Sequence, residues 1–248
     1  MDLGITGRRA AVAAGSGGLG LATARALAAE GAHVAICGRK EDRLTAAVAE
    51  IGPGTISITA DLSDPDAGTR FVRRAAEELG GPIDILIANA GGPPAGLPSS
   101  TPLDAYRSAL ELNCLSSIAM CLEAVGPMRA QGWGRIVAIT SIGARQPIPG
   151  LAASSVARAA VTSFIKTRAT EIAPDGVTAN TIQPGSHATD RITSLYGDSP
   201  AMTVDIPVGH LGDPADFGSV AAYLCSRSAS FICGASIIVD GGAARALQ

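Results

Sequence analysis

Short aliphatic runs alternate with longer amphipathic segments along almost the whole chain. Seven of these runs are nearly continuous in apolar residues, which is typical of parallel strands that are buried on both faces. We predict strands at Ala10–Ala14, His33–Cys37, Thr55–Ala60, Ile83–Ala88, Arg135–Thr140, Val177–Ile182 and Ser236–Val239.

Helical periodicity fills the segments between these runs. We predict helices at Leu19–Glu30, Glu41–Ile51, Pro65–Leu79, Leu103–Met128, Ala152–Ala173 and Pro214–Ser226. Gly31 and Gly80 follow two of these helices, at the position where glycine commonly ends a helix. The Asp-Pro dipeptides at 64–65 and 213–214 combine a capping side chain with a proline suited to the first helical turn.

Repeated strand–helix units of this kind predict an α/β fold with right-handed crossovers. We expect one doubly wound Rossmann-type domain over residues 1–248, with about seven parallel strands and helices on both faces of the sheet. The longest stretch without a predicted element is 184–213. A loop of that length is often a lid over a binding site, so we predict the substrate lid there.

Composition and charge then narrow the class of protein. Hydrophobic residues make up 47% of the chain, but with 1 Trp, 3 Tyr and 4 Phe the core must consist mainly of small aliphatic side chains. The net charge of −3 includes no long run of like charges, so we expect neither a nucleic-acid partner nor a membrane-binding patch. The five cysteines lack metal or redox spacing and the N-terminus lacks an apolar signal core, which favours a cytoplasmic protein without a metal site.

A glycine-rich segment lies between the first predicted strand and the first predicted helix. Residues 15–20 read Gly-Ser-Gly-Gly-Leu-Gly, a GxGxxG spacing. Such glycines let main-chain N–H groups and a helix N-terminus approach a pyrophosphate closely. An ordinary glycine-rich turn is the alternative, and the position between strand and helix makes it the weaker one. The predicted cofactor contacts are Gly15, Ser16, Gly18, Leu19 and Gly20.

The end of the second predicted strand indicates which dinucleotide binds. An acidic residue there would hold a ribose 2′-hydroxyl, whereas a basic residue favours a 2′-phosphate. This chain has Arg39 and Lys40 there, with no acid before Glu41. The planar guanidinium of Arg39 suits a phosphate, so we predict NADP(H) rather than NAD(H). The alternative is that both basic side chains are simply solvated.

These features resemble the short-chain dehydrogenase/reductase family over nearly the entire chain. The family's TGxxxGxG motif falls on residues 13–20, where Ala13 and Ala14 replace the threonine and the first glycine. The motifs most resemble those of 3-oxoacyl-(acyl carrier protein) reductases, that is, ketoreductases. The resemblance implies further cofactor contacts at Asp61-Leu62 for the adenine, at Asn89-Ala90-Gly91 after the fourth strand, and at Pro184, Gly185 and Thr189 for the nicotinamide carboxamide.

The resemblance also implies a catalytic set, from which this sequence departs. Asn113 and Ser141 match the family's active-site asparagine and serine. The family's catalytic tyrosine and lysine fall on Ser154 and Arg158, so YxxxK has become SxxxR. Four residues make about one helical turn, so both side chains share a face. Ser154 is too short and too weakly acidic to replace tyrosine, but it could hold a water or the substrate. Arg158 can bind ribose hydroxyls and stabilise negative charge, but it is a poor proton relay.

Another group must then supply the proton. His187 lies in the nicotinamide segment and titrates near working pH, so we predict that it is the donor if water is not. The alternative is that only its backbone contacts the cofactor. Tyr196 in the predicted lid is a second candidate.

We therefore predict an NADP(H)-dependent oxidoreductase that interconverts a carbonyl and an alcohol on a small organic or acyl substrate. One alternative is a catalytically weak NADP(H)-binding sensor or partner protein. Another is a reductase of a substrate that needs no strong acid, such as an imine. By resemblance, the helices predicted at 103–128 and 152–173 would form the contacts of a homotetramer or homodimer.

Overall fold

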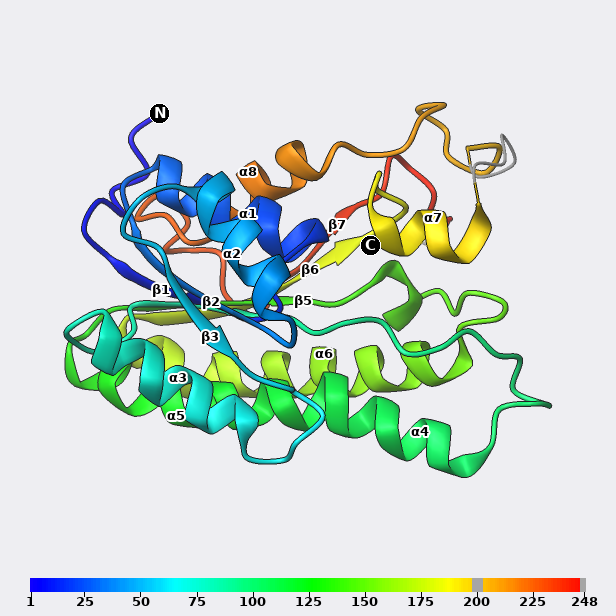
Figure 1. The fold of residues 1–248 in the computed structure, drawn as a ribbon, viewed down its shortest axis with the longest axis horizontal. Coiled ribbons are helices and arrows are strands. Elements are labelled where there is room, and N and C mark those ends of the chain that lie inside the picture. The colour runs from blue at the N-terminus through cyan, green and yellow to red at the C-terminus, as the bar shows by residue number, and fades with distance from the viewer. Residues whose placement is uncertain (198–202, 246–248) are drawn as a thin grey trace.

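In the described part of the chain, seven strands form one parallel sheet (Figure 1). Their order in the sheet is β3-β2-β1-β4-β5-β6-β7. The computed structural model describes residues 1–197 and 203–245. The strands are β1 (Arg9–Val12), β2 (His33–Gly38), β3 (Ile56–Thr59), β4 (Ile85–Ala88), β5 (Gly134–Ile139), β6 (Val177–Pro184) and β7 (Ser236–Val239). The chain winds outward from β1 in one direction and from β4 in the other. The predicted doubly wound α/β fold is therefore confirmed.

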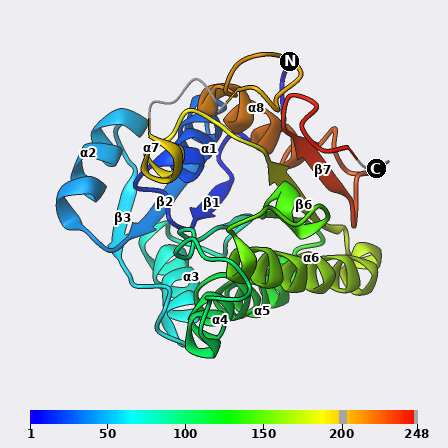
Figure 2. The same ribbon diagram turned by 90° about the vertical axis from the view of Figure 1, so that its right-hand side faces the viewer.

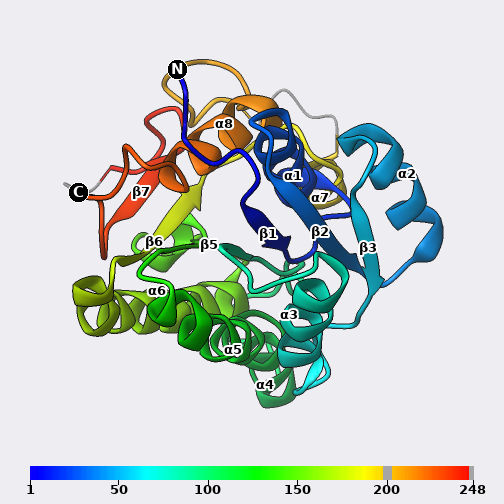
Figure 3. The ribbon, with the colours of Figure 1, turned by 90° about the vertical axis from the view of Figure 1, so that its left-hand side faces the viewer.

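Helices cover both faces of this sheet, as Figures 2 and 3 show from opposite sides. On one face lie α1 (Gly18–Ala29), α2 (Glu41–Ile51) and α8 (Pro214–Leu224). On the other lie α3 (Ala67–Glu78), α4 (Leu103–Ala109), α5 (Ser116–Ala130) and α6 (Ala152–Ile172). Most predicted bounds lie within two residues of those observed. Gly31 and Gly80 adopt φ angles of 82° and 72°, as helix-ending glycines do.

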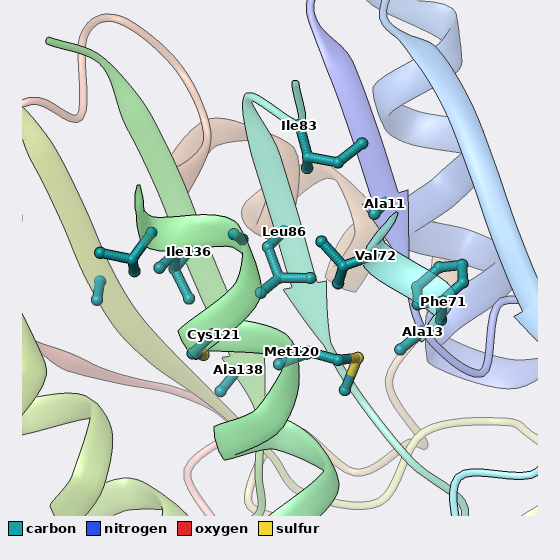
Figure 4. Close-up of a cluster of buried hydrophobic side chains, with 14 of the residues drawn as sticks. Ala11, Ala13, Phe71, Val72, Ile83, Leu86, Met120, Cys121, Ile136 and Ala138 are labelled. Carbon is teal, nitrogen blue, oxygen red and sulfur yellow. The ribbon is translucent and has the colours of Figure 1, made fainter. Parts of the chain in front are cut away.

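Small side chains allow the helices to approach the sheet and each other closely. On β1, Ala11 faces the cluster beneath α3 and α5 (Figure 4). Val12 faces the cluster beneath α1 and α8. A Cβ atom at Gly218 in α8 would lie 2.5 Å from the Ala22 carbonyl oxygen in α1. A side chain at that glycine would therefore separate the two helices.

The helix predicted at Leu103–Met128 is not a continuous α-helix. A π-helical turn at Leu110–Leu115 separates α4 from α5 and carries Asn113. Such turns insert one extra residue into a helix and occur frequently at functional sites. Among the described residues, the whole span Leu103–Ala130 is the one stretch long and apolar enough to cross a bilayer, and 50% of its apolar window is buried in the protein.

Two other local predictions were wrong. The segment 184–213 contains a short helix, α7 (Asp190–Tyr196), and residues 198–202 of this predicted lid lie outside the described residues. The dipeptide at 64–65 does not begin a helix, because α3 begins at Ala67. The Asp64 side chain instead accepts the Asp66 N–H and pairs with Arg70. The second Asp-Pro prediction is confirmed, since Asp213 accepts the Ala215 N–H at 2.8 Å at the start of α8.

Candidate active site

A cavity of about 710 Å³ opens at the carboxyl ends of the central strands. It lies beside the point between β1 and β4 where the strand order reverses, which is where open α/β sheets bind their ligands. Of the predicted site residues, only Gly15 and Asn113 do not line it. The cavity wall includes Ser16, Gly18, Leu19, Gly20, Arg39, Asp61, Leu62, Asn89, Ala90, Gly91, Ser141, Ser154, Arg158, Pro184, Gly185, His187 and Thr189.

The glycine turn at 15–20 exposes main-chain atoms to this cavity, because several of its residues have no side chain. A Cβ atom at Gly20 would lie 2.3 Å from the Ala14 carbonyl oxygen and 2.9 Å from Asn89 Nδ2, so only glycine fits there. A Cβ at Gly15 would lie 2.7 Å from the Ile36 side chain, so Gly15 allows the turn to pack on β2 rather than face the cavity. Helix α1 begins at Gly18, and its N-terminus is suited to an anion.

Ala14 occupies a strained position in the same turn. It is the only non-glycine residue with positive φ among those described, at 48°. It stands where the resemblance places the family's first glycine. The substitution thus retains the glycine conformation at the cost of side-chain strain.

Arg39 and Asp61 both line the cavity near each other, and Arg39 is exposed. The Asp61 carboxylate accepts hydrogen bonds from the main-chain N–H and the hydroxyl of Ser63, at 3.1 and 2.8 Å. These bonds, and to a smaller extent the positive charge of Arg39, lower the pKa of Asp61. Asp61 therefore stays ionised at neutral pH, beside a guanidinium that can bind a phosphate.

Arg43, which the sequence analysis did not single out, also lines the cavity. Its guanidinium lies against Gly17, with Nη2 2.6 Å from where a Cβ atom would stand, and it pairs with Asp190 of α7 at 3.1 Å. The signal was available, because Arg43 follows Arg39 by four residues and lies in the first turn of α2. This pair connects the glycine turn to the predicted lid.

The start of α7 and the residue before it contact the cavity wall on two sides. Thr189 contacts Gly18 on one side, with its Cγ2 3.7 Å from the position of a Cβ atom. On the other side, Arg191 Nη2 donates to the Pro93 carbonyl oxygen at 2.5 Å, in the loop after β4. The start of α7 is therefore held against the cavity wall both on the side of α1 and on the side of β4.

Ser154 and Arg158 occupy the first two turns of α6 and both line the cavity. Ser141 follows β5, and its Oγ accepts the Gly143 N–H at 3.0 Å. Its own O–H therefore remains able to donate. Ser154 is half-buried, and its hydroxyl forms no hydrogen bond with any described residue. The two serines present hydroxyl groups to one cavity.

The Arg158 side chain is buried, with 7% exposure. Its Nη1 donates to the Ile139 carbonyl oxygen at 2.5 Å and its Nη2 to the Ala90 carbonyl oxygen at 3.1 Å. Burial, and then the nearby positive charge of Arg191, lower the pKa of Arg158 to about 10. Arg158 is therefore still protonated at neutral pH.

Asn113 lies in the π-helical turn and is 1% exposed. Its side-chain nitrogen and oxygen are both buried and form no hydrogen bond in the described part of the chain, while its carbonyl oxygen accepts the Ser117 hydroxyl at 2.9 Å. Buried amides are nearly always hydrogen-bonded. The Asn113 side-chain amide is thus a buried polar group without a hydrogen-bond partner among the described residues, and it does not line the cavity.

The His187 ring packs against Phe217 of α8. It meets Phe217 edge to face at 5.2 Å and lies 2.5 Å from where a Cβ atom at Gly212 would stand. Its Nδ1 is 3.2 Å from the Gly185 carbonyl oxygen, and burial lowers the pKa of the ring. His187 is therefore neutral at neutral pH. Tyr196, the second candidate donor, is the last residue of α7, but its side chain is outside the part of the chain that the structure describes.

Sequence comparison identifies relatives that match nearly the whole chain. A family model described as enoyl-(acyl carrier protein) reductase matches residues 13–244. Dehydrogenase/reductase SDR family member 4 of Homo sapiens is 32% identical over 240 residues, covering 94% of this chain and 86% of that protein. Nodulation protein G of Rhizobium sp. (strain N33) is 33% identical over 243 residues, covering 97% and 98%.

Solved structures share the fold at similar identity. L-sorbose reductase from Gluconobacter frateurii, in complex with NADPH and L-sorbose, has a TM-score of 0.92 at 29% identity and covers 100% of both chains. A 3-oxoacyl (acyl-carrier-protein) reductase from Agrobacterium tumefaciens C58 with NADP bound has a TM-score of 0.90 at 32% identity, covering 97% of this chain and 95% of that one. This chain belongs to the short-chain dehydrogenase/reductase family of oxidoreductases.

Proposed function

We propose that this chain uses NADP(H) to interconvert a carbonyl and an alcohol on a small organic or acyl substrate. The observation that carries the proposal is the cavity itself. It is lined both by the glycine turn and Arg39, which suit a phosphorylated dinucleotide, and by Ser141, Ser154 and the buried guanidinium of Arg158. Solved relatives that contain NADPH or NADP support the same cofactor here.

The residues present fit this cofactor. The turn at 18–20 and the α1 N-terminus would hold the pyrophosphate, and the close approach at Gly20 leaves room for main chain but not for a side chain. Arg39 would hold the 2′-phosphate, with Asp61 and Leu62 beside the adenine. Pro184, Gly185 and Thr189 would hold the carboxamide. When bound, the cofactor supplies or accepts a hydride.

The chain's own residues would then orient the substrate and stabilise charge. The free O–H of Ser141 can donate to the substrate oxygen, and Ser154 can position a water in the space that its short side chain leaves. Arg158 would stabilise the negative charge that develops on that oxygen. Because the His187 ring packs on Phe217, we propose that water rather than His187 supplies the proton.

The test is to follow NADPH absorbance with a panel of ketones, oxo acids and acyl thioesters. We expect NADPH-dependent reduction of at least one class at a rate above that of the heat-denatured protein. Tight NADPH binding without turnover of any substrate would contradict the proposal.

A second candidate function is a cofactor-binding protein with little chemistry. It is favoured by the fixed position of Arg158, whose guanidinium binds two main-chain carbonyls instead of supporting an acid. The double variant S154Y/R158K discriminates between the two functions. A large gain in ketone reduction would indicate a decayed enzyme, whereas loss of an existing activity would indicate a distinct mechanism. The imine alternative is the weaker one, because Arg158 would repel an iminium cation.

Assembly and location complete the proposal. We propose a homotetramer or homodimer built through α5 and α6, where Leu122 and Val156 expose apolar side chains. Light scattering tests this, and a monomer would contradict it. We also propose a cytoplasmic location, which agrees with five free cysteines.

A further inference from the structure

An arginine outside the predicted cofactor contacts lies against the glycine turn. Arg43 lines the cavity, and its Nη2 is 2.6 Å from the position that a Cβ atom at Gly17 would occupy. Gly17 immediately precedes Gly18, where α1 begins. A side chain at residue 17 would have to displace this guanidinium. The positive charge of Arg43 therefore lies next to the helix N-terminus that suits a phosphate.

The same turn also contacts the end of β2. The Ser16 hydroxyl oxygen lies 2.6 Å from where a Cβ atom at Gly38 would stand, and Arg39 follows Gly38 in the sequence. Residues 16 and 17 of the turn thus contact both the Arg43 guanidinium and the strand end that carries Arg39. Arg39 and Arg43 line one cavity, so a phosphorylated ligand in it meets two guanidinium groups.

In the described part of the chain, Arg43 has one ion-pair partner, Asp190, which is the first residue of α7. Arg43 Nη2 donates to Asp190 Oδ2 at 3.1 Å, and the two side chains are 49% and 88% exposed. An ion pair as exposed as this one contributes little to stability. This single bond leaves most N–H donors of the guanidinium available to an anion.

Asp190 connects this cation to α7. Thr189, the residue before the helix, also reaches the glycine turn, with its Cγ2 3.7 Å from the position of a Cβ atom at Gly18. The start of α7 therefore contacts two successive glycines, Gly17 through Arg43 and Gly18 through Thr189. A ligand that fixes the Arg43 guanidinium would also restrain the start of α7.

We propose that Arg43 binds a phosphate of the nucleotide while it keeps its pair with Asp190, so that the bound phosphate holds α7 against the glycine turn. Arg43 is then a further binding residue and Asp190 a positioning residue. A planar guanidinium can donate to a carboxylate and a phosphate at the same time, since its N–H groups point in several directions. This inference rests on the proposed cofactor.

The first measurement is nucleotide binding by calorimetry. We expect R43Q to raise the NADPH dissociation constant about fivefold or more. An equal rise for NADH assigns Arg43 to the pyrophosphate, whereas an unchanged value for NADH assigns it to the 2′-phosphate. R25Q is the matched control, because Arg25 of α1 forms a similarly exposed pair with Glu50 of α2 and does not line the cavity.

The second measurement is amide hydrogen exchange at residues 190–195, with and without saturating NADPH. We expect NADPH to slow exchange there about tenfold or more in the wild type and in R25Q, but less than about threefold in R43Q and D190N. D190N retains Arg43, so its NADPH dissociation constant should stay within about threefold of the wild-type value. D190N thus separates the restraint on α7 from the binding of phosphate.

The inference is overturned if R43Q binds NADPH as tightly as the wild type, or if NADPH protects α7 equally in the wild type and D190N. Its failure is distinguishable from that of the proposed function. Tight NADPH binding that R43Q leaves unchanged defeats only the role of Arg43. Weakened binding in R43Q, without turnover of any substrate by the wild type, supports that role and contradicts the proposed reaction. A wild-type protein that binds neither NADPH nor NADH overturns both.

Discussion

The Arg158 guanidinium lies 2.5 Å from the carbonyl oxygen of Ile139, the last residue of β5. A second bond from the same side chain reaches Ala90, after β4. Arg158 therefore connects α6 to the ends of two neighbouring strands, so that it holds the floor of the site as well as lining it.

Loss of these two bonds should destabilise the protein. In R158A both carbonyls lose a charged donor, and the fold loses a buried side chain. We expect the free energy of unfolding to fall by about 2 to 4 kcal/mol, measured by urea denaturation. The free energy of unfolding should fall less in R158K, because a lysine can still donate a hydrogen bond to one of the two carbonyls. A change below about 0.5 kcal/mol in R158A would contradict this role.

Relief of backbone strain at Ala14 should stabilise the protein. Ala14 holds a φ of 48°, which glycine adopts without steric cost. We expect A14G to raise the free energy of unfolding by about 0.5 to 1 kcal/mol, since strain of this kind exceeds the entropy that alanine saves in the unfolded chain. G20A, two residues into α1, is the opposite case, because its Cβ would lie 2.3 Å from the Ala14 carbonyl oxygen. An A14G protein less stable than the wild type would refute the strain argument.

Arg39 should determine which dinucleotide binds. In R39Q the contact with a 2′-phosphate is lost, while the glycine turn is unchanged. We expect the NADPH dissociation constant to rise about tenfold or more, and that for NADH to change little. K40Q, which alters the adjacent exposed cation, is the control. Equal effects of R39Q on both nucleotides would show that Arg39 does not read the phosphate.

A substitution of His187 distinguishes between water and the His187 ring as the proton donor. Its ring packs on Phe217, so we expect H187Q to change kcat by less than about threefold on the best substrate found. If the ring were the general acid, kcat would fall by roughly 10² to 10⁴. The pH profile of kcat, measured in parallel, should keep its shape in H187Q.

The same histidine should make stability depend on pH. Burial lowers the pKa of His187 below its ordinary value of about 6.5, so the folded protein binds this proton less readily than the unfolded chain does. Its contribution is fully present above about pH 6.5 and is lost as the pH falls toward the folded pKa. We expect the wild type to lose more stability than H187Q between about pH 7 and pH 5. Parallel losses in urea titrations would contradict this assignment.

The strands, the glycine turn and Arg39 could be predicted because their signals are local, whereas most other residues of the cavity wall were predicted from the family resemblance. Continuous apolar runs mark strands buried on both faces, and the glycine turn is defined by adjacent residues. The π-helical turn was missed because one extra residue hardly changes an apolar pattern as rich as that of Leu110–Leu115. Helix α7 was missed because it is only 7 residues long and mostly polar.

Contacts between distant segments account for the rest. The anchoring of Arg158 depends on carbonyls 19 and 68 residues away in the sequence, and the place of Arg191 depends on a loop 98 residues away. The orientation of the His187 ring follows from its packing on Phe217 and Gly212. None of these relationships has a local signature, so they follow from tertiary packing alone.

Calorimetry with the wild-type protein is the most direct test of the cofactor site. NADPH and NADH are titrated separately under identical salt and pH. The glycine turn and Arg39 together predict binding of NADPH, with a dissociation constant at least about tenfold lower than that of NADH. The account is contradicted if neither nucleotide gives a heat of binding and neither competes with the other for the protein.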